Sequence, residues 1–382
     1  MTSTTPVGQA HHERRPAASI GRQPGSCASG RIAGLAGRFP KSADPNRART
    51  RARSPRLLAG AMLAFLTFAP PGPARAQTQA PQPQPWTLGE AQIREIVGRV
   101  RAGRDLTPKA WPNGARVAVG LSFDFDNETV TLRDGRDSVS QLSQGEYGAR
   151  AGLPRVLDLL RRHRVPASFF VPAVSALLHE SSMKAIVAAG HEVGLHGWIH
   201  ERNSQLDEAT ERALMTRALD TLERIAGRRP VGMRTPSWDY SPSTITLARE
   251  LGLLYDSSLM ADDRPYEVVA AGQPTGIVEL PVEWILDDAP YFGMDRFSTI
   301  RPTMNQEEVY AIWKGEFDVA YEERGLFILT MHPHIVGHRA RAAMLDRLVA
   351  YMKSKPGVWF ATHEQIARYV AEQAGLKTPA TR

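Results

Sequence analysis

Two aspartates follow an apolar run in a pattern that suits chemistry. Asp124 and Asp126 come directly after the apolar run 116–123. Because side chains along a strand alternate with a period of two, both carboxylates lie on one face. Two carboxylates that close are stable only if a cation neutralises one or if one keeps its proton. They also fit an ordinary turn, where Asp is common because its side chain bonds to nearby backbone.

Histidines supply the second candidate group. His196 and His200 are four residues apart, which on a helical turn places two imidazoles on one face, where they hold a single divalent ion. A lone histidine pair is more often a surface or core feature. Here the pair follows an apolar strand in a chain with an aspartate pair at another strand end, which favours metal binding. Two histidines and one carboxylate suit Zn²⁺, although other first-row ions fit the same triad.

Two more groups follow apolar strands. Arg234 can pair with a neighbouring carboxylate, and Trp238 offers a flat apolar face of the sort that stacks on sugar rings. By themselves they also fit a helix-capping arginine and a core tryptophan. His332 ends a further strand and is a candidate proton donor, whereas His334 and His338 are expected in a loop.

The elements that must position these side chains alternate. Short β-rich runs and amphipathic helical stretches predict a parallel sheet covered by helices, either a closed barrel or an open doubly wound sheet. Seven or eight strands without a Gly-x-Gly-x-x-Gly motif favour an α/β barrel as a single catalytic domain. Asp207 and Ser241-Pro242 predict helix starts. We expect strands at 116–123, 167–171, 192–195, 231–233, 253–255, 277–281, 326–331 and 358–361, and helices at 153–162, 209–225, 243–251, 306–323 and 341–353.

The first 76 residues differ from the rest in charge. They hold 12 Lys and Arg against 2 Asp and Glu, a net of +10, whereas the remaining 306 residues hold 35 against 38, a net of −3. Nucleic-acid binding is excluded as the main function, because it needs basic charge on the folded body. The only cysteine, Cys27, lies in this leader, so the processed chain has no disulfide framework and no thiolate nucleophile.

The leader ends in the features of an export signal. Four arginines between positions 49 and 56 precede the apolar run 57–68, and Ala74-Arg75-Ala76 forms an A-x-A cleavage site. The run is shorter than the roughly 20 residues that span a bilayer. We expect residues 1–76 to be a disordered basic extension plus signal peptide, 77–105 a linker and N-terminal helix, and 106–382 the catalytic barrel. Cleavage after Ala76 implies a periplasmic or secreted protein without stable membrane insertion; the alternative is an uncleaved anchor.

Together these motifs resemble the NodB-homology polysaccharide deacetylases of carbohydrate esterase family 4. The resemblance covers roughly residues 117–370, and four motifs stand in the family's order. It is nearest to the branch of peptidoglycan-deacetylase-like, allantoinase-like and cyclic-imide hydrolase proteins, through the runs 191–200, 255–260 and 284–288. The resemblance implies a distorted (β/α) barrel and metal-assisted hydrolysis of a non-peptide C–N amide bond.

The resemblance also implies roles for individual residues. A divalent metal, which we expect to be Zn²⁺, would supply hydroxide at neutral pH, Asp124 would act as general base, Arg234 would tune that base, and His332 would protonate the leaving nitrogen. The expected metal ligands are Asp126, His196 and His200, and the expected substrate-binding residues are Trp238 and Trp284.

Three departures from the family pattern affect these roles. Phe125 separates two aspartates that are adjacent in the family, Gly197 replaces a Ser or Thr, and Ser237 intervenes before Trp238. The first affects which aspartate binds metal, the second removes a hydroxyl, and the third affects the sugar-stacking surface.

The favoured function is N-deacetylation of N-acetylated sugars in an envelope or extracellular polysaccharide, because export suits this task better than ureide metabolism. A rival function is hydrolysis of small cyclic imides or ureides. A second rival is a catalytically inactive glycan-binding barrel, which the full set of expected ligands disfavours. The expected partner is an N-acetylated glycan or a small cyclic amide, with no nucleic acid, and the sequence is compatible with a homo-oligomer.

Overall fold

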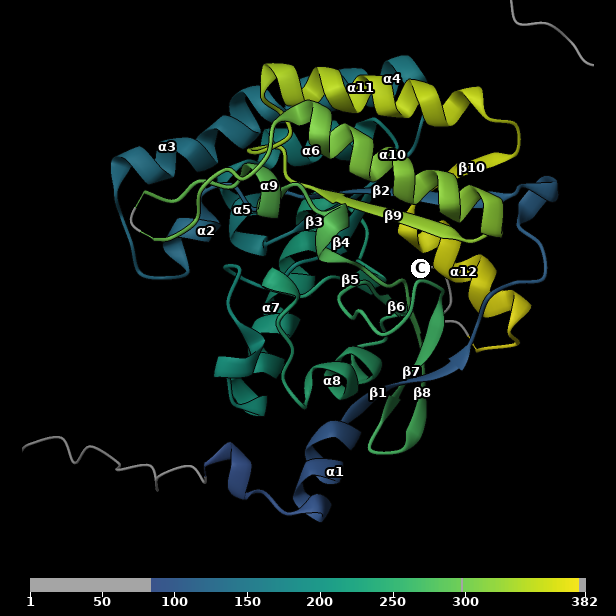
Figure 1. The fold of residues 1–382 in the computed structure, drawn as a ribbon. Coiled ribbons are helices and arrows are strands. Elements are labelled where there is room, and N and C mark those ends of the chain that lie inside the picture. The colour runs from purple at the N-terminus through teal and green to yellow at the C-terminus, as the bar shows by residue number, and fades with distance from the viewer. Residues whose placement is uncertain (1–83, 297, 378–382) are drawn as a thin grey trace, which may run out of the picture. The chain divides into compact units, whose positions relative to one another are not determined.

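The computed structural model describes residues 84–296 and 298–377, so the predicted signal peptide lies outside the described residues (Figure 1). The strands are β1 Val100–Asp105, β2 Val117–Asp124, β3 Ser168–Val171, β4 Glu192–Leu195, β5 Gly232–Met233, β6 Tyr255–Asp256, β7 Tyr266–Ala270, β8 Gln273–Glu279, β9 Leu326–Met331 and β10 Val358–Ala361. The helices are α1 Glu90–Gly98, α2 Thr129–Leu132, α3 Val139–Tyr147, α4 Leu153–His163, α5 Ala173–Leu178, α6 Glu180–Ala188, α7 Glu208–Ala226, α8 Thr244–Glu250, α9 Ala289–Phe292, α10 Gln306–Glu323, α11 Arg339–Ser354 and α12 His363–Gln373.

The strands form one sheet that curls around β2. Strand β9 pairs along one edge of β2, while β10 and β3 share the other edge. From β3 the parallel pairing continues through β4, β5 and β6 to β8. A bridge between Asp287 and Thr330 joins the segment after β8 to β9. The sheet therefore curls back on itself, and the predicted distorted (β/α) barrel is confirmed.

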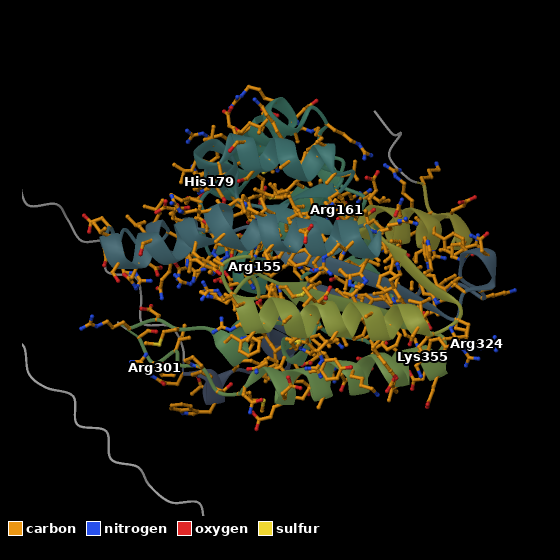
Figure 2. All side chains as sticks on the ribbon, turned by 90° about the horizontal axis from the view of Figure 1, so that it is seen from above. Arg155, Arg161, His179, Arg301, Arg324 and Lys355 are labelled. Atoms are coloured by element: carbon orange, nitrogen blue, oxygen red, sulfur yellow. The ribbon has the colours of Figure 1, made fainter. Side chains whose placement is uncertain are left out.

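Burial explains why the central strands have nearly continuous apolar sequences. All eight residues of β2 are buried, as expected for a parallel strand covered on both faces. Helices α4, α11 and α10 lie side by side on the outside of the sheet (Figures 1 and 2). The helix start predicted at Asp207 is confirmed, because its side chain accepts a hydrogen bond from the Thr210 amide at 2.7 Å. The start predicted at Ser241-Pro242 lies ahead of the helix: α8 begins at Thr244, and the Ser241 hydroxyl accepts from the Thr244 amide at 3.1 Å.

The predicted pattern omits two antiparallel strands, β1 and β7, which extend the sheet beyond β8. Strand β1 lies in the region 77–105, where the sequence predicts only a linker and a helix. Its residues Val-Arg-Ala-Gly-Arg-Asp are mostly exposed, so no apolar alternation marks it as a strand. Backbone pairing with β7 forms it instead. Among the described residues, no helix combines the length and apolar character needed to cross a bilayer.

Candidate active site and metal centre

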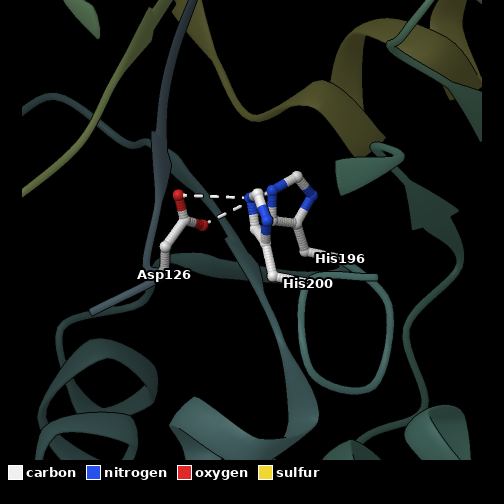
Figure 3. Close-up of side chains that lie close together, drawn as sticks. All are labelled: Asp126, His196 and His200. Atoms are coloured by element: carbon white, nitrogen blue, oxygen red, sulfur yellow. Dashed lines mark ion pairs between the residues drawn. The ribbon is translucent and has the colours of Figure 1, made fainter. Parts of the chain in front are cut away.

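Three predicted metal ligands converge at the carboxyl ends of β2 and β4. Asp126 Oδ1 lies 3.4 Å from His196 Nε2, and Asp126 Oδ2 lies 3.4 Å from His200 Nε2 (Figure 3). One donor atom from each side chain lies within 4.8 Å of the other two, and all three side chains are buried. Residues 74 positions apart in the sequence thus face a common point.

The donor atoms of this triad fit a divalent cation. Asp126 Oδ1 and His196 Nε2 are buried without a hydrogen-bond partner among the described residues. His196 Nδ1 lies 2.7 Å from the Arg234 carbonyl oxygen, so Nδ1 carries the proton and the lone pair of Nε2 faces Asp126. Burial lowers the pKa of His196, which keeps the imidazole neutral, as a metal ligand must be.

The helical turn predicted for residues 196–200 is wrong. After β4 the chain forms an irregular loop in which Gly197 and His200 take positive φ values of 73° and 66°. The Glu201 carboxylate accepts hydrogen bonds from the Trp198 and Ile199 amides. Because a side chain binds the amides that a helix would pair with carbonyls, helical geometry does not form. The two imidazoles converge because the loop folds back.

Asp124 is paired with a buried arginine. Arg234 Nη1 donates to Asp124 Oδ1 at 2.8 Å, and the same guanidinium donates to Ser122 and to the carbonyl and hydroxyl of Ser257. Arg234 is fully buried over the Phe170 ring, so it is not a helix cap. Asp124 and Asp126 therefore have different surroundings: the first is neutralised by arginine, and the second faces three imidazoles.

His332 approaches the triad from β9. Its Nε2 lies 3.5 Å from Asp126 Oδ2, and its Nδ1 lies 2.6 Å from Asp288 Oδ1. Burial alone lowers the pKa of His332, but the Asp288 and Asp287 carboxylates outweigh burial and raise that pKa well above its usual value. Burial also raises the pKa of Asp287 to about 7. These two carboxylates thus favour the protonated form of His332 beside Asp126, His196 and His200.

A cavity of about 680 Å³ opens over these groups. Trp238 and Trp284 line it with their rings in contact, the centroids being 4.0 Å apart. Trp238 is 6% exposed and Trp284 is 44% exposed, so mainly Trp284 presents an apolar face. Arg133, Asp287, Asp288 and His334 are among the residues that line the cavity or hold His332 and that the sequence prediction omitted. In the sequence, the run 284–288 indicated only the branch of the family. No spacing of residues indicated that Arg133 or His334 belongs to the site.

Arg133 contacts the triad from the cavity side. Its Nη1 lies 2.6 Å from His200 Nδ1 and 2.7 Å from the Ser237 hydroxyl. A guanidinium only donates hydrogen bonds, so His200 Nδ1 is the acceptor, and the proton of the neutral imidazole lies on Nε2. Coordination of an ion through Nε2 therefore requires Arg133 to turn away from Nδ1.

Comparison with known proteins gives consistent results. The polysaccharide deacetylase family model matches residues 144–255. A solved protein of Mycobacterium smegmatis assigned to the polysaccharide deacetylases is 36% identical, with a TM-score of 0.68, over 74% of this chain and 99% of that one. The peptidoglycan deacetylase of Helicobacter pylori is 28% identical over 66% of this chain and 94% of its own. The Puue allantoinase structure is 29% identical, with a TM-score of 0.62, over 70% of this chain and 97% of that one.

Proposed function

The chain belongs to the polysaccharide deacetylase family and is a hydrolase of C–N bonds other than peptide bonds, and we propose that it removes acetyl groups from N-acetylated sugars in a metal-dependent reaction. The observation that carries this proposal is the pair of buried, unpartnered atoms, Asp126 Oδ1 and His196 Nε2, directed at one point. A divalent cation satisfies a carboxylate oxygen and an imidazole lone pair together.

The catalytic roles follow from the contacts of each side chain. Asp126, His196 and His200 would hold the ion, which when bound supplies Lewis-acid activation. Asp124 accepts a proton at Oδ2, because Arg234 occupies Oδ1. His332 delivers a proton from Nε2 to the leaving nitrogen, while Asp288 holds the opposite ring nitrogen.

The two adjoining tryptophans and the predicted export signal support a glycan outside the cytoplasm as the substrate. Trp238 and Trp284 provide an apolar wall to the cavity, which suits the face of a sugar ring. The proposal includes a periplasmic or secreted location, supported by the predicted export signal and by the peptidoglycan deacetylase relative. Zn²⁺ is the proposed ion, on the basis of two imidazoles and one carboxylate.

Hydrolysis of a small cyclic imide or ureide is the second candidate. The similarity to the Puue allantoinase, which extends over almost all of that protein, favours it specifically. The same carboxylate, imidazolium and metal triad can open a cyclic amide, since the bond cleaved is again C–N.

One experiment separates the two functions. The purified protein is incubated with N-acetylglucosamine oligomers, with peptidoglycan and with cyclic imides, before and after chelation and with Zn²⁺ restored. We expect acetate release from a glycan, its loss in chelator and its recovery with metal. Turnover of cyclic imides without acetate release from any glycan would favour the second candidate, and full acetate release by metal-free protein would remove the metal from the proposal.

A further inference from the structure

The guanidinium of Arg234 makes only one hydrogen bond to the carboxylate of the proposed base. Arg234 Nη1 donates to Asp124 Oδ1 at 2.8 Å and to the Ser122 hydroxyl at 2.8 Å. Nε and Nη2 donate to Ser257, and Nη2 also faces His363. Each nitrogen of the guanidinium thus has an acceptor other than Asp124. Among the described residues, Asp124 supplies the one carboxylate paired with Arg234.

A single contact is not the form that this pair takes most readily. The planar fork of guanidinium N–H groups matches the two oxygens of a carboxylate, so arginine and carboxylate frequently pair through two parallel hydrogen bonds. Arg234 is 0% exposed and Asp124 is 2% exposed, and burial increases the need of both charged groups for hydrogen bonds. The single contact therefore needs a cause in the surrounding structure.

Ser257 supplies this cause, because it occupies one edge of the guanidinium as a carboxylate would. Its carbonyl oxygen accepts from Arg234 Nε at 2.9 Å, and its hydroxyl oxygen accepts from Arg234 Nη2 at 2.9 Å. Ser257 directly follows β6, and its amide donates to the Met233 carbonyl at 3.0 Å. The backbone of Ser257 is therefore fixed beside β5, which leads into Arg234.

His363 is a second, weaker acceptor for Nη2. Burial, followed by repulsion from Arg234, lowers the pKa of His363 well below its usual value, so the imidazole is neutral and can accept a hydrogen bond. His363 Nε2 lies 3.5 Å from Arg234 Nη2, a length at which a hydrogen bond is weak. The hydroxyl of Ser257 is therefore the main partner of Nη2.

We propose that Ser257 is a positioning residue for the catalytic base: by holding Nε and Nη2 of Arg234, it limits Asp124 to a single contact and keeps Asp124 Oδ2 free to accept a proton. This inference rests on the proposed deacetylase function, in which Asp124 is the base. Asp124 Oδ2 lies 3.7 Å from His196 Nε2, so the free oxygen is on the side of the proposed metal ligands. A bidentate pair would instead occupy Oδ2 and remove the acceptor that base catalysis needs.

Ser257→Ala tests the proposal, because it removes the hydroxyl and keeps the carbonyl. Arg234 Nη2 then loses its main partner and can donate to Asp124 Oδ2. We expect kcat for acetate release from N-acetylglucosamine oligomers to fall by about 10- to 100-fold, because a hydrogen bond between charged groups must break before Oδ2 can accept. KM and the zinc content should stay at the wild-type values. Ser257→Thr, which keeps the hydroxyl, should recover most of the lost kcat.

Ser258→Ala is the matched control. Ser258 is the next residue and is equally buried, but its hydroxyl donates to Asp256 Oδ1 and accepts from the Thr235 amide. Its loss removes a buried hydroxyl without freeing a donor of Arg234. Urea unfolding should therefore show a loss of stability in both alanine variants, whereas only Ser257→Ala should lose kcat.

A crystal structure of Ser257→Ala gives a readout that does not depend on turnover, and it should show Arg234 donating to both oxygens of Asp124. If this variant does not fold, Ser257→Cys carries the same test, because a thiol of similar size is a weaker acceptor; its kcat should also fall at constant KM. An unchanged kcat in folded, zinc-loaded protein, or a single contact between Arg234 and Asp124 in the variant structure, would overturn the positioning role and leave the deacetylase function standing. Failure of the wild type to release acetate from any glycan would instead overturn the function on which this role rests.

Discussion

At the scale of single residues, two aspartates separated by one phenylalanine have different partners. Asp124 is bound to Arg234, whereas Asp126 faces three imidazoles. The side chain of Phe125 is buried in the core between them. The one-residue insertion relative to the family pattern therefore leaves both carboxylates at the site and gives them separate surroundings.

Because the two aspartates have different partners, replacing each by asparagine should have different effects. Asp124→Asn should keep its metal but lose about 10²- to 10⁴-fold in kcat, the usual contribution of a general base. Asp126→Asn should lose metal first, because an amide is a weaker ligand than a carboxylate. Metal content by mass spectrometry, measured alongside kcat, checks both variants. The opposite pattern would mean that the base and the ligand are exchanged.

At the scale of elements, the loop between β4 and α7 requires glycine at position 197. Gly197 has φ +73°, and a Cβ atom there would lie 2.9 Å from Pro236 Cγ and 3.1 Å from Glu201 Oε1. Glu201 is the residue that holds the loop amides. A Ser or Thr, as in the family pattern, would strain this backbone and disturb the acceptor that shapes the loop.

Gly197→Ala should therefore destabilise the fold by roughly 1–2 kcal/mol and weaken zinc binding, because the loop carries both histidine ligands. Gly190→Ala is a close control: its φ is +78°, but no atom lies within 4 Å of the point that a Cβ would occupy. It should show the backbone penalty alone and keep wild-type zinc affinity. Urea unfolding and zinc titration of both variants measure the two effects, and equal zinc affinities would refute the steric argument.

At the scale of the whole molecule, a buried acid pair makes stability depend on pH. Asp256 on β6 and Glu279 on β8 are register partners, and both are fully buried. Glu279 Oε1 accepts hydrogen bonds from the Ser258 and Leu259 amides, while Glu279 Oε2 and Asp256 Oδ2 have no hydrogen-bond partner within the described part of the chain. Burial and then the Asp256 carboxylate raise the pKa of Glu279 well above its ordinary value of 4.5, which favours the protonated form of Glu279 in the folded protein.

A raised folded-state pKa means that the unfolded chain releases this proton first. The stabilisation is complete below pH 4.5 and declines as pH rises toward the folded-state pKa, by about 1.4 kcal/mol for each unit of difference between the two states. Glu279→Gln keeps the oxygen that accepts from the Ser258 and Leu259 amides and supplies an N–H to Asp256. The free energy of unfolding of this variant should therefore not show the decline with rising pH that Glu279 causes.

The pH dependence of the free energy of unfolding can be measured by urea unfolding of wild type and Glu279→Gln between pH 5 and pH 9. Glu322→Gln, at an exposed position of α10, is the control. A decline that is the same in Glu279→Gln and wild type would show that other groups cause it.

Much of this protein follows from the sequence alone, because its signals are local. Apolar runs of three to eight residues predicted the parallel strands, including β4, β9 and β10 to the residue. The carboxyl ends of parallel strands meet at one edge of a sheet, so side chains placed there had to converge. For this reason Asp124, Asp126, His196, Arg234 and His332 could all be named before their contacts were known.

Only the tertiary structure decided features that depend on partners distant in sequence. The Asp288 carboxylate on His332 and the Arg133 guanidinium on His200 join residues 44 and 67 positions apart, and no periodicity encodes such pairs. The loop at His200 took its shape from the Glu201 side chain rather than from helical spacing. Strand β1 exists through backbone pairing with β7, which leaves no mark on side-chain polarity. Strand ends determine where functional groups gather, whereas packing determines which of them pair.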